Sequence, residues 1–246
     1  MGKKNKDIKE AKKEEKKREV SVSREYFELI VETALFVFFV MTYVVQAFEI
    51  PTGSMEDTLL IGDHLLVNKF AYSPATNSFE RKFLPYKQIK RGDIVTFKYP
   101  EDPTKDFVKR VIALGGEKIQ IVNKRVFING KPLDEPYKFH KDNRIYFKSQ
   151  FLPEEIIVRD NFGPVEVPQD CFFVMGDNRD NSSDSRVWGF LHRDYIKGKP
   201  WIIYWSYKAK RGEHLKTGLE KIKSIFETII TFIPKTRWER FFKIIK

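Results

Sequence analysis

The sequence predicts a mainly β domain, with a small inserted β subdomain, tethered to a membrane by one N-terminal helix. Two observations carry this prediction. Residues 29–48, LIVETALFVFFVMTYVVQAF, are 20 residues with one ionisable group, Glu32. Beyond residue 60 the chain runs in short β-branched and aromatic segments separated by Gly, Pro, Asn and Asp.

The apolar run has the length of a transmembrane helix. At about 1.5 Å per residue it spans roughly 30 Å, the thickness of the hydrocarbon core. We place the helix over residues 27–50, because Pro51 interrupts the backbone ladder. A buried core helix would carry a polar stripe, and a cleaved signal peptide would have a shorter apolar region followed by an A-x-A site.

Residues 1–26 form a lysine-rich tail that predicts the orientation of the helix. Residues 1–25 hold 10 Lys/Arg and 6 Asp/Glu. The positive-inside rule keeps this tail in the cytoplasm and places everything after residue 50 on the outer face. Ser54, six positions after Phe48, is then expected close to the outer membrane surface.

The net charge of +11 lies at the two ends of the chain. Residues 206–246 carry 11 basic and 4 acidic side chains, and residues 26–205 carry 24 of each. A balanced middle argues against nucleic-acid binding. The single cysteine excludes an intramolecular disulfide and a multi-cysteine zinc site, and no Cys/His ligand spacing indicates a metal.

The strand candidates define the domain organisation. IQIVNKRVFING predicts a tight hairpin at Asn123-Lys124, within an inserted subdomain over residues 120–170. Residues 51–119 and 171–205 form the main β domain. The predicted strands have the sequences HLLVNKFAY, GDIVTFKYP, DFVKRVIAL, EKIQIVN, RVFING, CFFVMG and PWIIYW.

Residues 206–246 are expected to be an amphipathic, basic C-terminal extension. Apolar residues recur at helical spacing over residues 215–233, and PKTRWERFFKIIK follows. Two interpretations stay open. The helix contacts the membrane surface, in keeping with the basic excess and the aromatic residues, or it packs on the core of the protein.

Ser54, in PTGSMEDTLL, is a candidate nucleophile without a histidine partner. None of the four histidines stands in a triad pattern. A serine hydroxyl needs a base, and a desolvated lysine is the alternative. In DFVKRVIAL, alternation puts Lys109 in an apolar row with Phe107 and Val111. The competing interpretation is an edge-strand lysine that reaches solvent.

Residues 176–190, GDNRDNSSDSRVWGF, concentrate polar side chains after a predicted strand. Such composition is typical of a polar turn. It also fits a hydrogen-bonded loop that supports a site through Asp184, Arg186 and a serine hydroxyl.

These three segments, in this order, resemble the conserved boxes of the bacterial type I signal peptidases, which are serine-lysine proteases. PTGSMEDTLLIGD resembles the nucleophile box, RGDIVTFKYPEDPTKDFVKRVIALGGEKI the lysine box, and GDNRDNSSDSRVWGF the closing box. The resemblance covers roughly residues 27–205. It implies the signal-peptidase-like catalytic β fold.

The resemblance also implies roles for individual residues. Ser54 matches the nucleophile and Lys109 the general base. The Ser54 N–H and the Thr52 hydroxyl match the oxyanion hole, and Ser182 matches the serine that hydrogen-bonds the lysine amine. Asp184 and Arg186 match the ion pair that supports the loop over residues 176–190, which we call the closing loop. The substrate pockets match Phe48, Ile50, Pro51, Met55, Leu59, Leu65, Phe107 and Val108.

The implied activity is removal of signal peptides from exported preproteins after A-x-A-type sites, through an acyl-enzyme on Ser54 and without a cofactor. The implied partners are preprotein signal peptides, the lipid bilayer and a nearby export translocon. The implied location is the bacterial cytoplasmic membrane. Asp57 departs from the family pattern, which has proline there, and residues 206–234 look like an insertion before TRWERFFKII.

Two other functions compete with this one. A self-cleaving repressor has a similar serine-lysine core, but it is soluble and carries a DNA-binding domain, which the membrane span argues against. A catalytically inactive membrane-anchored adaptor is the second alternative, and the intact Ser54, Lys109 and Ser182 argue against it.

Overall fold

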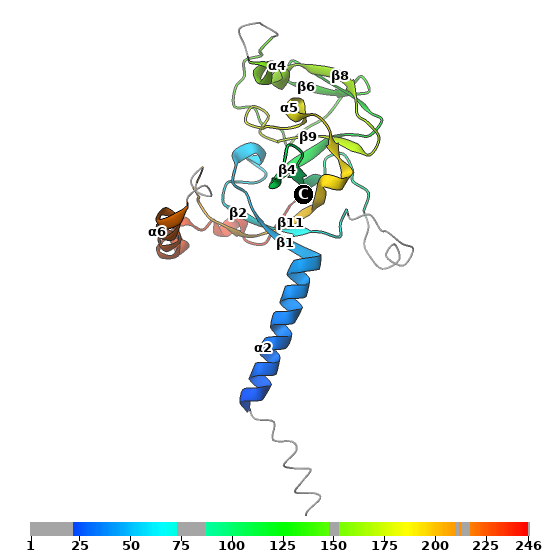
Figure 1. Ribbon diagram of the computed structural model, residues 1–246. Coiled ribbons are helices and arrows are strands. Elements are labelled where there is room, and N and C mark those ends of the chain that lie inside the picture. The colour runs from blue at the N-terminus through cyan, green and yellow to red at the C-terminus, as the bar shows by residue number, and fades with distance from the viewer. Residues whose placement is uncertain (1–21, 73–86, 148–152, 210–211, 213–216, 246) are drawn as a thin grey trace, which may run out of the picture. The chain divides into compact units, whose positions relative to one another are not determined.

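Figure 1 shows the computed structural model, which describes residues 22–72, 87–147, 153–209, 212 and 217–245. The chain divides after Val44 into two compact units, residues 1–44 and 45–246. Of the basic tail predicted for residues 1–26, residues 1–21 lie outside the described part.

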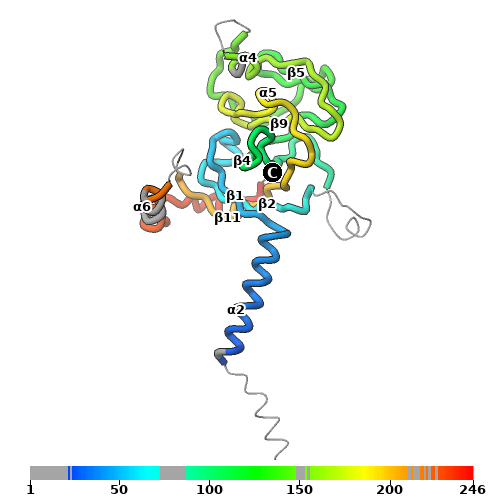
Figure 2. Tube along the Cα trace, in the orientation of Figure 1, coloured from blue at the N-terminus to red at the C-terminus, as the bar shows by residue number. Residues whose placement is uncertain are grey.

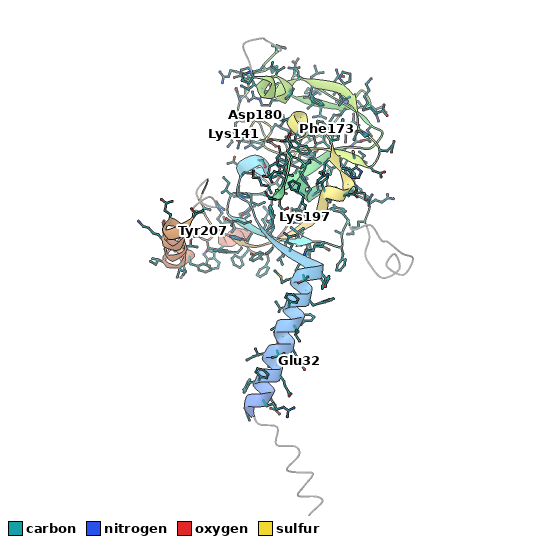
Figure 3. The ribbon with its side chains drawn as sticks, viewed as in Figure 1. Glu32, Lys141, Phe173, Asp180, Lys197 and Tyr207 are labelled. Atoms are coloured by element: carbon teal, nitrogen blue, oxygen red, sulfur yellow. The ribbon has the colours of Figure 1, made fainter. Side chains whose placement is uncertain are left out.

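The first unit is an apolar helix. It consists of α2 (Val22–Phe39) and the π-helical turn η1 (Val40–Val44). The segment Arg24–Val44 has a mean hydropathy of 1.9 and is long enough to cross a membrane. Between Leu29 and Val44, Glu32 is the one acidic or basic residue, and Figure 3 labels it.

The helix ends earlier than the sequence predicts. Residues 45–49, expected in the helix, belong to strand β1 (Val45–Glu49). This strand pairs antiparallel with β2 (Asp63–Asn68), so Phe48 faces Leu65 across the ladder. Hydropathy did not reveal this boundary, because an apolar strand continues the apolar helix without a break. Ser54 therefore follows the end of the helix by ten residues.

The second unit is built on an eight-stranded antiparallel sheet, which confirms the mainly β fold. The strand order is β1-β2-β11-β3-β4-β9-β10, and β12 pairs with β11. The remaining strands of this sheet are β3 (Ile94–Tyr99), β4 (Asp102–Leu114), β9 (Cys171–Met175), β10 (Leu191–His192), β11 (Ile196–Ser206) and β12 (Lys243–Ile244).

A four-stranded sheet holds the segment that was expected to be an inserted subdomain. Its order is β7 (Lys131–Pro132), β6 (Arg125–Ile128), β5 (Lys118–Val122) and β8 (Phe162–Glu166). The hairpin at Asn123-Lys124 is confirmed, with φ of 50° and 66° at the two residues. Positive φ at both positions matches the twist of the strands. In Figure 1 this sheet lies at one end of the unit and β1 at the other.

Several helices lie against these sheets or follow them. Helix α4 (Glu154–Asp160) belongs to the small-sheet segment, and α5 (Ser185–Trp188) lies in the closing loop. Helix α6 (Gly218–Ile230) confirms the helix predicted from residue 215, of which residues 215 and 216 lie outside the described part. The tube in Figure 2 shows α6 beside the β1–β11 end of the unit.

The chain after α6 returns to the main sheet. It forms α7 (Phe232–Lys235), the 3-10 turn η5 (Trp238–Arg240) and β12. Arg240 makes an ion pair with Asp63 of β2, and both side chains are buried. The end of the predicted C-terminal extension is thus part of the main sheet.

Among the residues that the structure describes, the buried apolar side chains form three clusters. One of them lies between β1, β2, β4 and the segment after Pro51. It contains Ile50, Met55, Leu59, Leu65, Ile94, Val108, Ile203 and Ile245. This cluster holds Met55 and Val108, the chain neighbours of Ser54 and Lys109, and so it supports the candidate site.

Candidate active site

Ser54 lies in the short 3-10 turn η2 (Gly53–Met55) and is buried. Met55, the next residue, is buried in the core cluster, and its packing there holds the turn in place. The first N–H groups of such a turn have no partner within it, so the Ser54 N–H is a donor available at the site. The local fold presents a serine hydroxyl on a rigid, apolar base.

The turn after Ser54 explains the unusual Asp57. Glu56 has φ −53° and ψ 146°, Asp57 has φ 79°, and the Thr58 N–H donates to the Met55 carbonyl at 3.1 Å. These values describe a type II β-turn, whose third residue needs positive φ. Aspartate tolerates that conformation better than most residues, whereas the proline ring fixes φ near −65°. The nucleophile box of this chain therefore has a turn that proline cannot form.

Lys109 lies on β4, which has β3 on one side and β9 on the other. The competing interpretation, an edge-strand lysine in solvent, is wrong, because only 3% of the Lys109 surface is exposed. Its Nζ donates a hydrogen bond to Ser54 Oγ at 2.7 Å. The Phe107 ring lies 5.3 Å from the same amine. The predicted pair is thus in direct contact across 55 residues of sequence.

Burial lowers the pKa of Lys109 from 10.5 to about 8. The negative charges of Asp184 and Asp177 raise the pKa of this lysine, whereas the Arg186 guanidinium lowers it further. A pKa near 8 leaves roughly a tenth of the amine neutral at pH 7. Lys109 is therefore a competent proton acceptor near neutral pH.

The closing loop touches the Ser54 turn through a glycine. A Cβ placed on Gly176 would lie 2.4 Å from both the Ser54 carbonyl oxygen and Ser182 Oγ. The Asn178 N–H also donates to the Ser54 carbonyl, at 3.1 Å, and its Nδ2 donates to the Gly53 carbonyl at 2.9 Å. Only a glycine at position 176 permits this close approach.

Ser182 differs from its expected arrangement. Its Oγ is buried, and it makes no hydrogen bond of ordinary geometry, to Lys109 or to any other residue that the structure describes. The Asp184 carboxylate is near enough for the Ser182 hydroxyl to help lower its pKa. Ser182 lines the same cleft as Ser54 and Lys109.

Asp184 and Arg186 form the ion pair that the sequence predicted. Arg186 Nε donates to Asp184 Oδ1 and Nη2 to Oδ2, each at 2.8 Å, and both residues are buried. Burial opposes ionisation of Asp184, but the Arg186 guanidinium, together with the Ser182 hydroxyl and the Lys109 amine, holds the Asp184 pKa below its usual range. Asp184 also accepts a hydrogen bond from the Gly176 N–H, which ties the pair to the loop.

A second buried ion pair was not expected from the sequence. Arg110, the neighbour of Lys109, donates to both oxygens of Asp177, at 2.8 and 2.7 Å. The Thr58 hydroxyl donates to the same carboxylate at 2.6 Å. Asp177 therefore joins the lysine strand, the closing loop and the turn after Ser54. The alternation of side chains along the strand predicts that Arg110 lies on the opposite face from Lys109, but it does not identify Asp177 as the partner of Arg110.

A cleft of about 530 Å³ opens over Ser54 and Lys109. Thr52 lies on its wall and is exposed. Two predicted pocket residues, Leu59 and Leu65, are instead fully buried in the core cluster below, so their place on the wall is corrected. The predicted pocket residues that do line the cleft are Phe48, Ile50, Pro51, Met55, Phe107 and Val108.

Helix α4 contributes a wall of the cleft that sequence reasoning missed. Ile156 and Arg159 line it together with Asp180 and Val187. Figure 3 labels Asp180 and Lys141 near each other beside this region. A helix of seven residues is too short to show a reliable 3.6-residue period, so the sequence held no signal for it.

The family model of the signal peptidases, peptidase S26, matches residues 23–205. This match covers most of the chain and spans all three boxes around Ser54, Lys109 and Gly176. The chain belongs to the signal peptidase family. The resemblance inferred from the sequence is therefore confirmed.

Several curated relatives support the same assignment. Signal peptidase I of Aquifex aeolicus is 34% identical over 71% of this chain and 81% of its own length. Signal peptidase I of Pseudomonas fluorescens is 33% identical, over 74% and 72%. Among solved structures, a signal peptidase I from Enterococcus faecalis is 30% identical, covers 46% of this chain and 97% of its own, and has a TM-score of 0.35.

The signal peptidase site described above has no cluster of metal-ligating side chains. Among residues 22–72, 87–147, 153–209 and 217–245, no three His, Cys, Asp or Glu side chains gather in a way that would hold an ion. The predicted absence of a cofactor stays a prediction.

Proposed function

We propose that this signal peptidase is a membrane-anchored serine endopeptidase that removes N-terminal signal peptides from preproteins by a serine-lysine mechanism. The observation that carries the proposal is the 2.7 Å contact between Lys109 Nζ and Ser54 Oγ inside a cleft. Membership of the peptidase family supports the reaction class.

In the first step, neutral Lys109 takes the proton of the Ser54 hydroxyl while Oγ attacks the scissile carbonyl carbon. The lysine then gives this proton to the leaving amine as the C–N bond breaks, and an acyl-enzyme remains on Ser54. The same amine, now neutral again, takes a proton from a water molecule whose oxygen attacks the ester carbonyl carbon, and it returns that proton to Ser54 Oγ as the acyl bond breaks. Apolar burial suits Lys109 to this cycle, since it keeps a usable fraction of the amine uncharged.

The oxyanion is assigned to two donors, the Ser54 N–H and the Thr52 hydroxyl. Thr52 lines the cleft next to the nucleophile turn and makes no capping hydrogen bond to that turn. A single preorganised donor of this kind is typically worth about 3–4 kcal/mol. Ser182, Asp184 and Arg186 are assigned to orienting the lysine and supporting the closing loop.

Specificity for small residues at the −1 and −3 positions is assigned to the apolar part of the cleft. Ile50 and Met55 are buried at its base, and Val108 flanks the lysine. A shallow wall of fixed aliphatic side chains accepts an alanine methyl and excludes larger groups. A-x-A-type sites fit this arrangement.

The apolar helix anchors the enzyme in the membrane. We assign the lysine-rich tail to the cytoplasm and the β unit to the outer face of the bacterial cytoplasmic membrane. In that orientation Ser54 follows the membrane exit by ten residues. A signal peptide leaving the export translocon presents its cleavage site in the same layer.

Cleavage of a preprotein tests the reaction. The detergent-solubilised full-length chain is incubated with a preprotein whose signal peptide ends in A-x-A, and Ser54→Ala and Lys109→Ala are compared with Lys105→Ala. Lys105 lies on the same strand but is exposed. We expect both site variants to lose cleavage and the control to keep it. Wild-type rates in both site variants would refute the dyad.

Protease protection tests the orientation. The full-length chain is expressed in bacteria, and intact spheroplasts are treated with an added protease. The assignment expects loss of the β unit and survival of the N-terminal tail. A protected β unit would place it in the cytoplasm instead.

A further inference from the structure

The tip of the β5–β6 hairpin carries a lysine that does not reach into solvent. Lys124 has a φ of 66° in the turn, and its side chain is 9% exposed. Its Nζ donates hydrogen bonds to the Asp142 carbonyl at 2.8 Å and to Asp180 Oδ1 at 3.0 Å, and it lies 3.3 Å from Asp160 Oδ1. The tips of hairpins normally lie at the surface. The predicted turn therefore does more than reverse the chain.

Asp180 connects this lysine to the cleft. It belongs to the closing loop, lines the cleft and stands two residues before Ser182. Its Oδ1 accepts the Lys124 hydrogen bond and lies 3.2 Å from His140 Nδ1, and its Oδ2 accepts from the Asp142 N–H at 2.8 Å. Burial raises the pKa of Asp180, but these hydrogen bonds hold it below its usual range. All three partners come from the segment that holds the small sheet.

Lys124 balances two buried carboxylates. The side chains of Asp160 and Asp180 are 0% and 5% exposed, and both lie within 3.3 Å of Lys124 Nζ. Arg159 is a second cation between them, with Nε 3.1 Å from Asp160 Oδ1 and 3.6 Å from Asp180 Oδ1. Burial lowers the pKa of His140, so this ring adds no charge at pH 7. Without the lysine, two desolvated carboxylates would share one guanidinium, and a displacement of Asp180 would relieve that cost.

Other contacts hold the first half of the closing loop. The Phe139 N–H donates to the Asp177 carbonyl at 2.8 Å, and the Arg179 N–H donates to the Phe139 carbonyl at 2.9 Å. Arg179 also forms a buried ion pair with Glu135. These contacts end one residue before Asp180. Loss of the lysine is therefore expected to release the loop from Asp180 onward, while the part before it stays in place.

Ser182 depends on its neighbours in the chain for its position. Its hydroxyl makes no hydrogen bond of ordinary geometry to the residues that the structure describes. On one side of it, Asp184 is fixed by the ion pair with Arg186. On the other side, Asp180 is fixed by the ion pair with Lys124. A displacement of Asp180 therefore moves Ser182 relative to the nucleophile and its base.

We propose that Lys124 is a positioning residue for cleavage, which through Asp180 holds Ser182 in the cleft that it shares with Ser54 and Lys109. The proposal rests on the serine-lysine function proposed above, and it assigns the small sheet a part in that function. The apolar part of the cleft belongs to the main sheet and its core cluster. A change at Lys124 is therefore expected to leave substrate binding nearly intact.

Hydrogen–deuterium exchange of the detergent-solubilised full-length chain tests the positioning without an activity assay. Lys124→Gln removes the charge and keeps an amide donor. Arg125→Gln is the matched control, since Arg125 is the next residue of the hairpin and is exposed. The Asn181 N–H, which donates to the Asn178 carbonyl at 3.2 Å, reports on the loop. We expect it to exchange about tenfold faster in Lys124→Gln and at the wild-type rate in the control. An unchanged rate in Lys124→Gln would overturn the proposal.

Cleavage kinetics test the consequence of the positioning. With a preprotein whose signal peptide ends in A-x-A, Lys124→Gln should lower kcat by about 10- to 100-fold and change KM by less than about twofold, because a small displacement of the reacting groups slows the reaction. Asp180→Asn should lower kcat to the same extent, and the double variant should lose no more than either single variant. A wild-type kcat in Lys124→Gln would overturn the proposal, and so would losses that multiply in the double variant.

Melting temperatures identify a folding defect in these variants. The Lys124 N–H donates to the Asp160 carbonyl at 2.9 Å, and this backbone bond survives the substitution. If Lys124→Gln does not fold, Asp180→Asn decides: a lowered kcat supports the proposal and a wild-type kcat overturns it. A wild-type chain that does not cleave would refute the proposed function, and the exchange rates would still show whether Lys124 holds the loop.

Discussion

Lys109→Met should make the protein more stable while it removes the proposed base. Burial lowers the pKa of this amine from 10.5 to about 8. Below pH 8 the lysine is charged in both the folded and the unfolded states, so the folded state bears the full cost of a buried charge. That difference in pKa corresponds to about 3 kcal/mol.

Two further contributions set the net effect of Lys109→Met. Methionine fills a similar volume without a charge. The variant loses the hydrogen bond to Ser54, which is worth about 1 kcal/mol. We therefore expect a gain in unfolding free energy of about 2 kcal/mol at pH 7.

The dependence on pH identifies the cause. Between pH 8 and 10.5 the folded lysine loses its proton before the unfolded one, so the cost of the buried charge fades as pH rises. Above this window the gain should be gone, and the lost hydrogen bond should leave the variant slightly less stable. A gain that persists above the window would have another cause.

Urea denaturation of the detergent-solubilised chain, followed by tryptophan fluorescence, measures the difference at each pH. Lys105→Met is the matched control, since its exposed side chain pairs with Asp102 at the surface. We expect less than about 0.5 kcal/mol for the control at every pH. A Lys109→Met protein less stable than wild type at pH 7 would refute a charged, desolvated lysine.

Three other predictions follow from the site. The cleavage rate should rise about tenfold per pH unit on the acid side of pH 8 and level off above it, because only neutral Lys109 accepts the serine proton; a rate already constant from pH 6 upward contradicts the assigned base. Asp177→Asn should lower the unfolding free energy by about 3–5 kcal/mol, since it leaves Arg110 buried without its charge partner. Asp102→Asn, at an exposed pair, should cost less than about 1 kcal/mol, and equal losses would mean that burial is not the cause. Asp57→Gly should preserve stability and cleavage, whereas Asp57→Pro should reduce both, because a backbone φ of 79° is accessible to glycine and inaccessible to proline. The melting temperature and the cleavage rate of the two variants measure this difference. A fully stable, active proline variant would disprove the type II turn.

The strands were predictable because their signal is local. All seven segments proposed as strands are strands, and the hairpin turns at Asn123-Lys124 as expected. Alternation of side chains and turn residues depends only on neighbours in the chain. The strands that were missed are the two-residue β7, β10 and β12, the proline-containing β8, and β1, which follows the apolar helix directly at Val45.

The sequence by itself determined the chemical types at the site. A serine without a histidine, an apolar row around Lys109 and a polar closing loop, taken in this order, carry the family resemblance that implies a serine-lysine pair. These are properties of residue type and order along the chain, and the family resemblance rests on them.

Tertiary structure decided what those residues experience. Alternation could not tell a solvated Lys109 from a buried one; packing against Ser54 and beside Asp184 and Arg186 of the closing loop buries the amine, and burial lowers its pKa. The same holds for Asp177, whose partners Arg110 and Thr58 are 67 and 119 residues away. Desolvation and ion pairing depend on which distant segments pack together, and no local pattern contains that information.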